Sequence, residues 1–422
     1  MKPRITIIAL LLCTVSLNSF AQKYIGGDIS MLTKYEDSGA TYYDNSGNTI
    51  TSPLTFFSEQ GMNTMRVRLF VNPNKTTTDP NNSGKTITDE NVCQDIELVK
   101  ALGKRIKDAG LKLMLDFHYS DTWADPAKQW TPAGWANLSD ADIYTKIYVY
   151  TKDVLTDLVA AGATPDFIQT GNEISYGMLW GTPTTSSSAL KKCFISSTSN
   201  WNYLTTLLTN ATKACREVCP NAKIIIHTER TAQPDVLTGF YDQINSAKVD
   251  YDIIGLSYYP YFHGALNILE TALTSLENKY SKNIMIVETG YPYAWTVPGT
   301  TYDYSGTYAY SDAGQKAFTD DLITLLNKHS KVNGLFWWWM EYNAKGTSLS
   351  GWYNAPLFDS RTGRATPALS ELKNFLSPTD VSTIHTSTET KDDSWYQISG
   401  SKVSKPKHPG VYINNGKKVL IK

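Results

Sequence analysis

The chain alternates short apolar runs with longer stretches of helical periodicity. Several apolar runs are nearly continuous, as in 223–228 and 284–289, which is typical of parallel strands covered on both faces. Eight runs predict strands: 24–30, 64–70, 111–118, 166–171, 223–228, 253–259, 284–289 and 334–340.

Helical patterns separate these runs. Segment 92–109 carries apolar residues at helical spacing and is followed by Gly110, a helix stop. The same scheme predicts four further helices: 143–160, 201–218, 266–280 and 313–327. Eight strand–helix repeats predict an α/β fold, a (β/α)8 TIM barrel over residues 22–376. A doubly wound open sheet is the alternative, but no glycine-rich phosphate turn follows the first predicted strand.

The first residues predict a signal peptide, 1–21. Lys2 and Arg4 precede an apolar stretch, 5–17, which is too short to span a bilayer, and Ser19-Phe20-Ala21 supplies a cleavage pattern. Cys13 suggests a lipoprotein instead, but the residue before it is a leucine rather than a small residue. We therefore expect export to the cell surface or periplasm, without a transmembrane segment.

The C-terminal part has a different composition. Residues 377–394 are rich in Ser, Thr and Asp and predict a linker, and 395–422 predict a short β-rich tail with an Asn-Asn-Gly turn at 414–416. The tail resembles the C-terminal sorting tails of proteins exported by the type IX system of Gram-negative bacteria. A remnant tail, or a hairpin packed on the barrel, is an equally open interpretation.

Composition narrows the range of partners. A formal net charge of −1 gives no electrostatic argument for nucleic acid or an anionic membrane. The chain has 11 Trp and 26 Tyr, whose flat apolar faces suit sugar rings. The four cysteines beyond residue 22 lack the spacing of a zinc site, and a domain of this size does not need disulfides to fold, so we expect buried or free thiols. We expect a monomer with no metal or other cofactor.

Two glutamates stand at strand ends, where the active sites of such barrels lie. The fourth predicted strand ends at Asn172-Glu173, and the seventh ends at Glu288-Thr-Gly. These strands face each other across the barrel mouth. A retaining glycosidase needs two carboxyl groups roughly 5–5.5 Å apart, one protonated and one ionised. Either glutamate alone could be a helix cap or an ion-pair partner, but the pair predicts catalysis.

The neighbours of the two glutamates suggest their roles. Asn172 could hold a sugar hydroxyl beside Glu173, the expected acid/base. Glu288 is the expected nucleophile, kept ionised by Arg66 or Arg68 from the second strand. A structural ion pair with Asp28 or Asp116 is the alternative role for Arg66.

Other polar and aromatic side chains follow the strands. We expect His118, Asp121 and Trp123 to contact sugar, and Trp339, on the same strand face as Trp337, to form the floor of the cleft. Glu341 is a weaker third carboxylate, expected to be an ion-pair or loop residue. Five more tryptophans in loops favour a long cleft that accepts a polymer: Trp130, Trp135, Trp180, Trp295 and Trp352. Neither a Gly-x-Ser-x-Gly elbow nor a nucleotide fingerprint occurs.

Five segments resemble a known family: Gly27-Asp-Ile-Ser-Met-Leu32, Met65-Arg-Val-Arg-Leu-Phe-Val-Asn-Pro73, Leu115-Asp-Phe-His-Tyr-Ser-Asp-Thr-Trp-Ala-Asp-Pro126, Thr170-Gly-Asn-Glu173 and Val287-Glu-Thr-Gly-Tyr-Pro292. They are similar to glycoside hydrolase family 53, the arabinogalactan endo-β-1,4-galactanases, over about residues 24–376. The resemblance implies a retaining barrel enzyme that cleaves β-1,4-galactan, with Glu173 as acid/base and Glu288 as nucleophile. Five further positions match the family's sugar-binding residues: Arg68, His118, Asn172, Tyr259 and Trp339.

One departure concerns calcium, which some family members hold in the loop after the seventh strand. Here that loop, 291–312, has only Asp303 and Asp312 as acids, and calcium needs several oxygen ligands, so calcium is not favoured.

Two other functions remain open. The chain could act on another β-1,4-glycan, such as mannan or cellulose, or bind surface glycans without catalysis.

Overall fold

A computed structural model describes residues 22–79, 82–343, 355–376, 395–397, 402–406, 408–414 and 417–421. The chain divides into two compact units, 1–378 and 379–422. The predicted signal peptide, the predicted linker and Trp352 lie outside the described residues.

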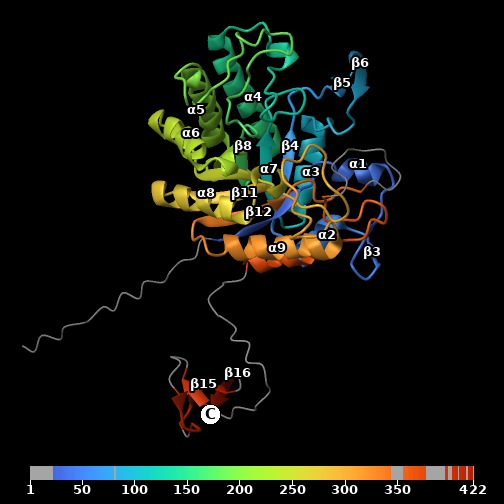
Figure 1. The fold of residues 1–422 in the computed structure, drawn as a ribbon, viewed down its shortest axis with the longest axis vertical. Helices are drawn as coiled ribbons and strands as arrows, with labels where there is room; N and C mark the ends of the chain where they lie inside the picture. The colour runs from blue at the N-terminus through green and yellow to red at the C-terminus, as the bar shows by residue number, and fades with distance from the viewer. Residues whose placement is uncertain are drawn as a thin grey trace, which may run out of the picture. The chain divides into compact units, whose positions relative to one another are not determined.

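The first unit is built on a closed barrel of eight parallel strands in the order β1-β12-β11-β10-β9-β8-β7-β4 (Figure 1). Its strands are β1 (Tyr24–Asp28), β4 (Thr64–Leu69), β7 (Lys112–Phe117), β8 (Phe167–Thr170), β9 (Lys223–Thr228), β10 (Ile253–Tyr258), β11 (Asn283–Thr289) and β12 (Val332–Trp337). Each overlaps one predicted strand, so the TIM barrel is confirmed and the doubly wound sheet is excluded.

Helices form the outer layer around the strands (Figure 1). The five predicted helices are present as α3 (Ile96–Asp108), α4 (Asp140–Ala160), α5 (Trp201–Val218), α8 (Leu266–Lys279) and α9 (Asp312–Leu326). The prediction missed α6 (Pro234–Ser246), between β9 and β10.

Short elements complete the unit. They are α1 (Leu32–Asp37), α2 (Pro53–Glu59), α7 (Pro260–His263), α10 (Pro367–Glu371), three 3-10 turns η1 (Ala133–Trp135), η2 (Arg230–Ala232) and η3 (Leu372–Leu376), and two small hairpins, β2 (Tyr42–Tyr43) with β3 (Thr49–Ile50) and β5 (Thr76–Asp79) with β6 (Asn82–Thr88).

Side-chain caps fix where several long helices begin. The side chain of Asp95 accepts a hydrogen bond from the backbone N–H of Leu98 at the start of α3. Ser139 and Ser311 act in the same way at the starts of α4 and α9. Each cap satisfies one N–H group that the first helical turn leaves without a partner.

The barrel interior has an apolar layer beneath a polar one. The apolar layer comprises Met114, Phe167, Ile225, Ile253, Met285, Val287 and Phe336. Asp116, Gln169 and His227 lie two residues further along β7, β8 and β9, and all three are buried. Side chains two residues apart share a strand face, so strand alternation places these polar groups above the apolar plug, at the C-terminal end of the barrel.

The four described cysteines are buried free thiols, as predicted: Cys93, Cys193, Cys215 and Cys219. Burial raises the pKa of Cys193 to about 12 and that of Cys219 to about 11. These thiols are therefore protonated at neutral pH and unreactive.

The second unit contains a four-stranded antiparallel sheet in the order β14-β13-β15-β16. Its strands are β13 (Trp395–Gln397), β14 (Lys402–Val403), β15 (Gly410–Asn414) and β16 (Lys417–Ile421). Part of the predicted Asn-Asn-Gly turn, 415–416, lies outside the described residues. A role in sorting stays a prediction.

Across the described parts of both units, no helix combines the length and apolarity that crossing a membrane requires.

Close packing of β1 on β4 makes one glycine indispensable. A Cβ atom on Gly26 would lie 1.7 Å from the carbonyl oxygen of Thr64, and neither backbone can move without breaking the barrel register. We expect Gly26→Ala to lower the free energy of unfolding by about 3 kcal/mol or more, measured by urea denaturation. Gly134→Ala is the matched control, because a Cβ there meets no atom within 4 Å. Equal stability of the two variants would contradict this account.

Candidate active site

A cavity of about 550 Å³ opens at the C-terminal ends of the strands. Both predicted catalytic residues, Glu173 and Glu288, line it. The lining also includes four predicted sugar contacts: Trp123, Asn172, Tyr259 and Trp339. The remaining lining residues are Asp89, Asn91, Ala124, Asp125, Pro126, Lys128, Glu229, Phe262, His263 and Trp338.

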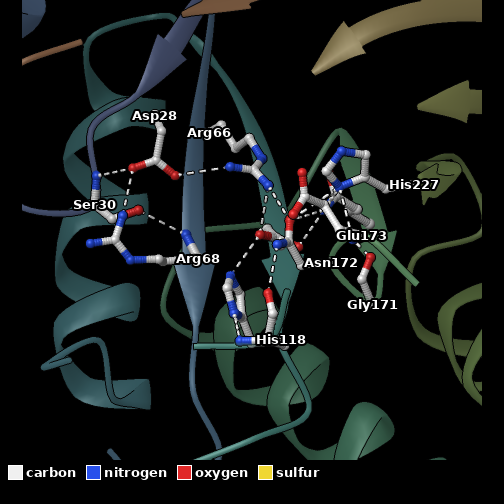
Figure 2. A network of polar contacts seen from close by, with 12 residues as sticks. Asp28, Ser30, Arg66, Arg68, His118, Gly171, Asn172, Glu173 and His227 are labelled. Carbon is white, nitrogen blue, oxygen red and sulfur yellow. Dashed lines mark hydrogen bonds and ion pairs between the residues drawn. The ribbon is translucent and has the colours of Figure 1, made fainter. Parts of the chain in front are cut away.

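The guanidinium of Arg66 holds the polar layer together (Figure 2). Arg66 is fully buried, and its Nη1 donates to Asp28 at 3.2 Å. Its Nη2 donates to Asp116 at 2.7 Å and to Asn172 Oδ1 at 3.0 Å. Nη2 also lies 2.8 Å from Oε1 of Glu288. Both expected ion pairs are therefore present, and Arg66, not Arg68, is the arginine that contacts Glu288.

Glu288 lies near the end of β11, with one oxygen toward Arg66 and the other toward β10. The hydroxyl of Tyr259 donates to its Oε2 at 3.0 Å. Burial raises the pKa of Glu288 to about 7, and Arg66 and Tyr259 act in the opposite direction by stabilising the carboxylate.

Glu173 occupies a different electrostatic setting. The hydroxyl of Ser257 donates to its Oε1 at 2.6 Å. Burial, followed by the charges of Glu288 and Glu229, raises the pKa of Glu173 well above its usual range. The first proton to leave this pair therefore comes from Glu288, so Glu173 stays protonated while Glu288 ionises.

His227 orients Glu173 directly through the Glu173 backbone and indirectly through Ser257. The backbone N–H of Glu173 donates to Nδ1 at 3.3 Å, and Nε2 lies 2.9 Å from the hydroxyl of Ser257. Burial and the nearby Arg66 lower the pKa of His227 well below its usual value, so the ring is neutral. With Nδ1 accepting, the remaining proton is on Nε2 and points to Ser257, whose own hydroxyl points to Glu173.

The backbone at Glu173 is left-handed, with φ of 50°. Gly171, two residues earlier, has φ of 101°. Left-handed conformations are uncommon for residues with a Cβ atom and cluster at functional sites. This turn aims the carboxyl of Glu173 into the cavity directly after β8 ends.

Three predicted sugar contacts are not among the residues that line the cavity. Arg68 is fully buried, paired with Asp28 at 3.0 Å, and its guanidinium lies 4.5 Å from the ring centroid of Trp123. His118 is buried, and its Nδ1 accepts from the backbone N–H of Ala124. Asp121 accepts from the backbone N–H groups of 72 and 133. These side chains support the loops that carry the lining residues.

The prediction for the eighth strand needs a correction. Trp337 was expected to share a face with Trp339, but β12 ends at Trp337 and the alternation stops there. Trp337 is buried, and its Nε1 donates to the carbonyl of Ala355. Trp338, which the sequence interpretation left out, lines the cavity together with Trp339.

Glu341 lies in the loop after β12 and outside the cavity lining. Its Oε1 accepts from the backbone N–H of Met31 at 2.8 Å. Burial, followed by the charge of Asp28, raises its pKa well above the usual range. Glu341 is therefore a buried loop residue away from the cavity, not a third catalytic carboxylate.

The sequence interpretation also missed Glu229, directly after β9. It lines the cavity, is 7% exposed, and pairs with Arg230 at 3.0 Å. The rule that found Glu173 and Glu288, to examine acids at strand ends, would have found Glu229 had it been applied to the fifth strand.

The described residues contain no group of three or more His, Cys, Asp or Glu side chains arranged to hold a metal ion. In the loop after β11, Asp303 accepts from the backbone N–H of Ser305 and from the hydroxyl of Tyr310.

Comparison with known proteins identifies the family. Residues 24–372 match Glycosyl hydrolase family 53. The chain belongs to that family. It is 32% identical over 378 residues to a probable arabinogalactan endo-β-1,4-galactanase A of Neosartorya fischeri, covering 85% of this chain and 95% of the relative. It is also 32% identical over 385 residues to an arabinogalactan endo-β-1,4-galactanase of Cellvibrio japonicus, covering 85% and 94%.

Solved structures of the family show the same barrel. The catalytic domain of the Ignisphaera aggregans family 53 protein superposes with a TM-score of 0.69 at 31% identity, covering 85% of this chain and 96% of that one. A fungal β-1,4-galactanase gives a TM-score of 0.67 at 29% identity, covering 84% and 99%. The resemblance of the sequence to family 53 is confirmed.

Arg66 offers a test of the polar layer in this family 53 barrel. Arg66→Met would leave Asp116 and Glu288 buried without the arginine and Asp28 paired with Arg68 alone, so we expect a loss of about 3–5 kcal/mol of unfolding free energy at neutral pH. Although burial opposes it, Arg66 holds the pKa of Asp116 below its usual value. The pKa of an aspartate in the unfolded chain is about 4. Above that pH the ionised Asp116 stabilises the folded wild type, and this contribution is lost as the pH falls through the lower pKa that Asp116 has in the folded protein.

The difference between wild type and Arg66→Met should accordingly shrink in acid. Urea denaturation at several pH values measures it. Lys104→Met, which removes an exposed ion pair with Asp108, should change stability little at any pH. A pH-independent difference for Arg66→Met would contradict the electrostatic account.

Proposed function

We propose that this protein hydrolyses β-1,4-galactosidic bonds within galactan and type I arabinogalactan by a retaining double displacement. One observation carries the proposal: Glu173 and Glu288 line one cavity, and only Glu288 lies against a guanidinium. The galactose preference rests on the names of the relatives, since nothing in the residue chemistry selects galactose over other sugars.

In the first step, Oε2 or Oε1 of ionised Glu288 attacks the anomeric carbon and a covalent glycosyl-enzyme ester forms. The bond from that carbon to the leaving oxygen breaks, and Glu173 gives its proton to this oxygen. Arg66 and Tyr259 orient Glu288 for the attack through the contacts described above.

In the second step, Glu173 is ionised and takes a proton from water, whose oxygen attacks the anomeric carbon. The ester bond to Glu288 breaks, and both residues return to their starting states. Two inversions at one carbon give net retention. Ser257 supports Glu173 in its ionised state by donating to Oε1.

Aromatic side chains support action on a polymer. Trp123, Trp338 and Trp339 line the cavity together with Phe262, and their ring faces can stack on successive sugars. A cavity that opens at the barrel mouth with rings along its wall suits binding within a chain. We therefore propose an endo mode of cleavage.

We also propose that the protein acts outside the cytoplasm, at the cell surface or in the periplasm. The support is the signal-peptide pattern of residues 1–21 and the size of the substrate, which cannot enter a cell intact.

The reaction can be tested on potato-type galactan. We expect the wild type to release galacto-oligosaccharides, and Glu288→Ala to lower kcat at least about 1,000-fold because the nucleophile is lost. Glu217→Ala, at an exposed site paired with Lys152, is the matched control and should keep full activity. Proton NMR of the first products should show the β-anomer at the new reducing end.

Three results would count against the proposal: no cleavage by the wild type, equal cleavage by Glu288→Ala, or initial α-product. Preferential cleavage of mannan or cellulose in the same assay would replace the proposed substrate. Tight galactan binding without any products would indicate a glycan-binding protein.

The pH profile should report the two carboxyl groups separately. Activity requires ionised Glu288 and protonated Glu173, so it rises through the first pKa and falls through the second. Tyr259→Phe removes a donor that lowers the pKa of Glu288, so the acid limb of kcat/KM should move to higher pH. Ser257→Ala removes a donor that lowers the pKa of Glu173, so the alkaline limb should move to higher pH.

Each substitution should move one limb more than the other. If Tyr259→Phe shifted only the alkaline limb, or Ser257→Ala only the acid limb, the assignment of roles would be reversed.

A further inference from the structure

The mouth of the barrel is divided by the two catalytic candidates. In the strand order, Glu173 follows β8 and Glu288 lies near the end of β11, so β9 and β10 form one arc between them. The other arc, formed by β12, β1, β4 and β7, carries Trp338 and Trp339 after β12 and Trp123 after β7. A sugar chain that passes between the two carboxyl groups must therefore leave one arc and enter the other.

The two arcs are not equivalent chemically. Glu288 contacts both arcs, because Arg66, which pairs with it, lies 5.6 Å from the ring centroid of Trp338, and the hydroxyl of Tyr259, directly after β10, donates to its other oxygen. Glu173 is tied to the β9–β10 arc through its hydrogen bond from Ser257 on β10. The acid protonates the leaving oxygen, and Glu173 hydrogen-bonds to the side chains of His227 on β9 and Ser257 on β10, so the β9–β10 arc faces the leaving group.

Glu229 supplies the polar group of that arc. It lines the cavity, is 7% exposed, and its Oε1 is held by Arg230 Nε at 3.0 Å and by the hydroxyl of Ser175. Its Oε2 is buried and has no hydrogen-bond partner among the described residues. A buried carboxylate oxygen without a donor is costly, and a sugar hydroxyl in the cavity can supply the missing hydrogen bond.

We propose that Glu229 binds a hydroxyl group of the sugar on the leaving-group side of the cleaved bond, and that Arg230 is a positioning residue that fixes the Glu229 carboxylate. This inference rests on the proposed glycosidase function and assigns a substrate contact within it. Outside the cavity lining, in the loop after β8, Tyr176 has its ring centroid 4.1 Å from the guanidinium carbon of Arg230 and packs against Phe194, which is 46% exposed. These two rings thus offer a surface for further sugar units next to the β9–β10 arc.

The experiment compares two substrates that differ on the leaving-group side. β-1,4-Galactotetraose places a sugar there, whereas nitrophenyl β-1,4-galactobioside places only an aromatic leaving group. We expect Glu229→Ala to lower kcat/KM for galactotetraose by about 10- to 100-fold, the loss of a hydrogen bond to a charged group, largely through KM. For the nitrophenyl substrate the change should stay below about threefold.

Companion variants sharpen the result. Glu229→Gln keeps an acceptor at the same place and should recover part of the KM effect. Arg230→Ala should also raise KM for galactotetraose, because Arg230 positions Glu229 although it does not itself contact the sugar. Glu217→Ala again serves as the control, and thermal unfolding checks that all variants fold.

Other outcomes are separable. Equal losses on both substrates would overturn the proposal and make Glu229 a structural residue. A shifted alkaline limb with unchanged KM would also overturn it, because Glu229 would then act only through its charge on Glu173. A wild type inactive on both substrates would instead overturn the proposed glycosidase function itself.

Discussion

The buried guanidinium of Arg66 is the interaction on which the mouth of this barrel depends. It joins side chains from four positions around the ring: Asp28 on β1, Asp116 on β7, Asn172 after β8 and Glu288 on β11. Removing these charges from water is unfavourable unless each one is paired. The paired side chains therefore have few alternative conformations, because the rigid planar guanidinium of Arg66 fixes the direction of each of its partners.

This constraint explains how two glutamates in one cavity acquire different properties. Glu288 is paired with the guanidinium of the charged layer, whereas Glu173 contacts neutral groups: its backbone N–H donates to His227, and its carboxyl accepts from the hydroxyl of Ser257. The polar layer itself follows from strand alternation above an apolar plug. The chemistry of the site is thus a consequence of register as much as of residue identity.

Fold prediction from the sequence succeeded where burial on both strand faces produces continuous apolar runs. All eight strands and five of the long helices follow from that signal. Helix α6 was missed although its buried residues Leu237, Phe240, Tyr241 and Ile244 have helical spacing. Membership of family 53 was also predictable, from motifs at the strand ends.

The site was only partly predictable. Strand ends identify residues near the mouth, as they did for Glu173 and Glu288, but they do not distinguish the cavity wall from the layer behind it. Arg68 and His118 lie in that second layer because the loop after β7, which carries Trp123 and Ala124, covers them. For the same reason Trp338 was missed: the position where β12 ends decides which tryptophan faces the cavity, and the sequence does not mark that position.

The left-handed backbone at Glu173 has a consequence for engineering this chain. A residue with a Cβ atom in that conformation carries about 1 kcal/mol or more of strain, which glycine would relieve. Selection of variants for thermal resistance alone would therefore favour loss of this carboxyl group, so a library screened without a galactan assay would drift toward stable but inert proteins.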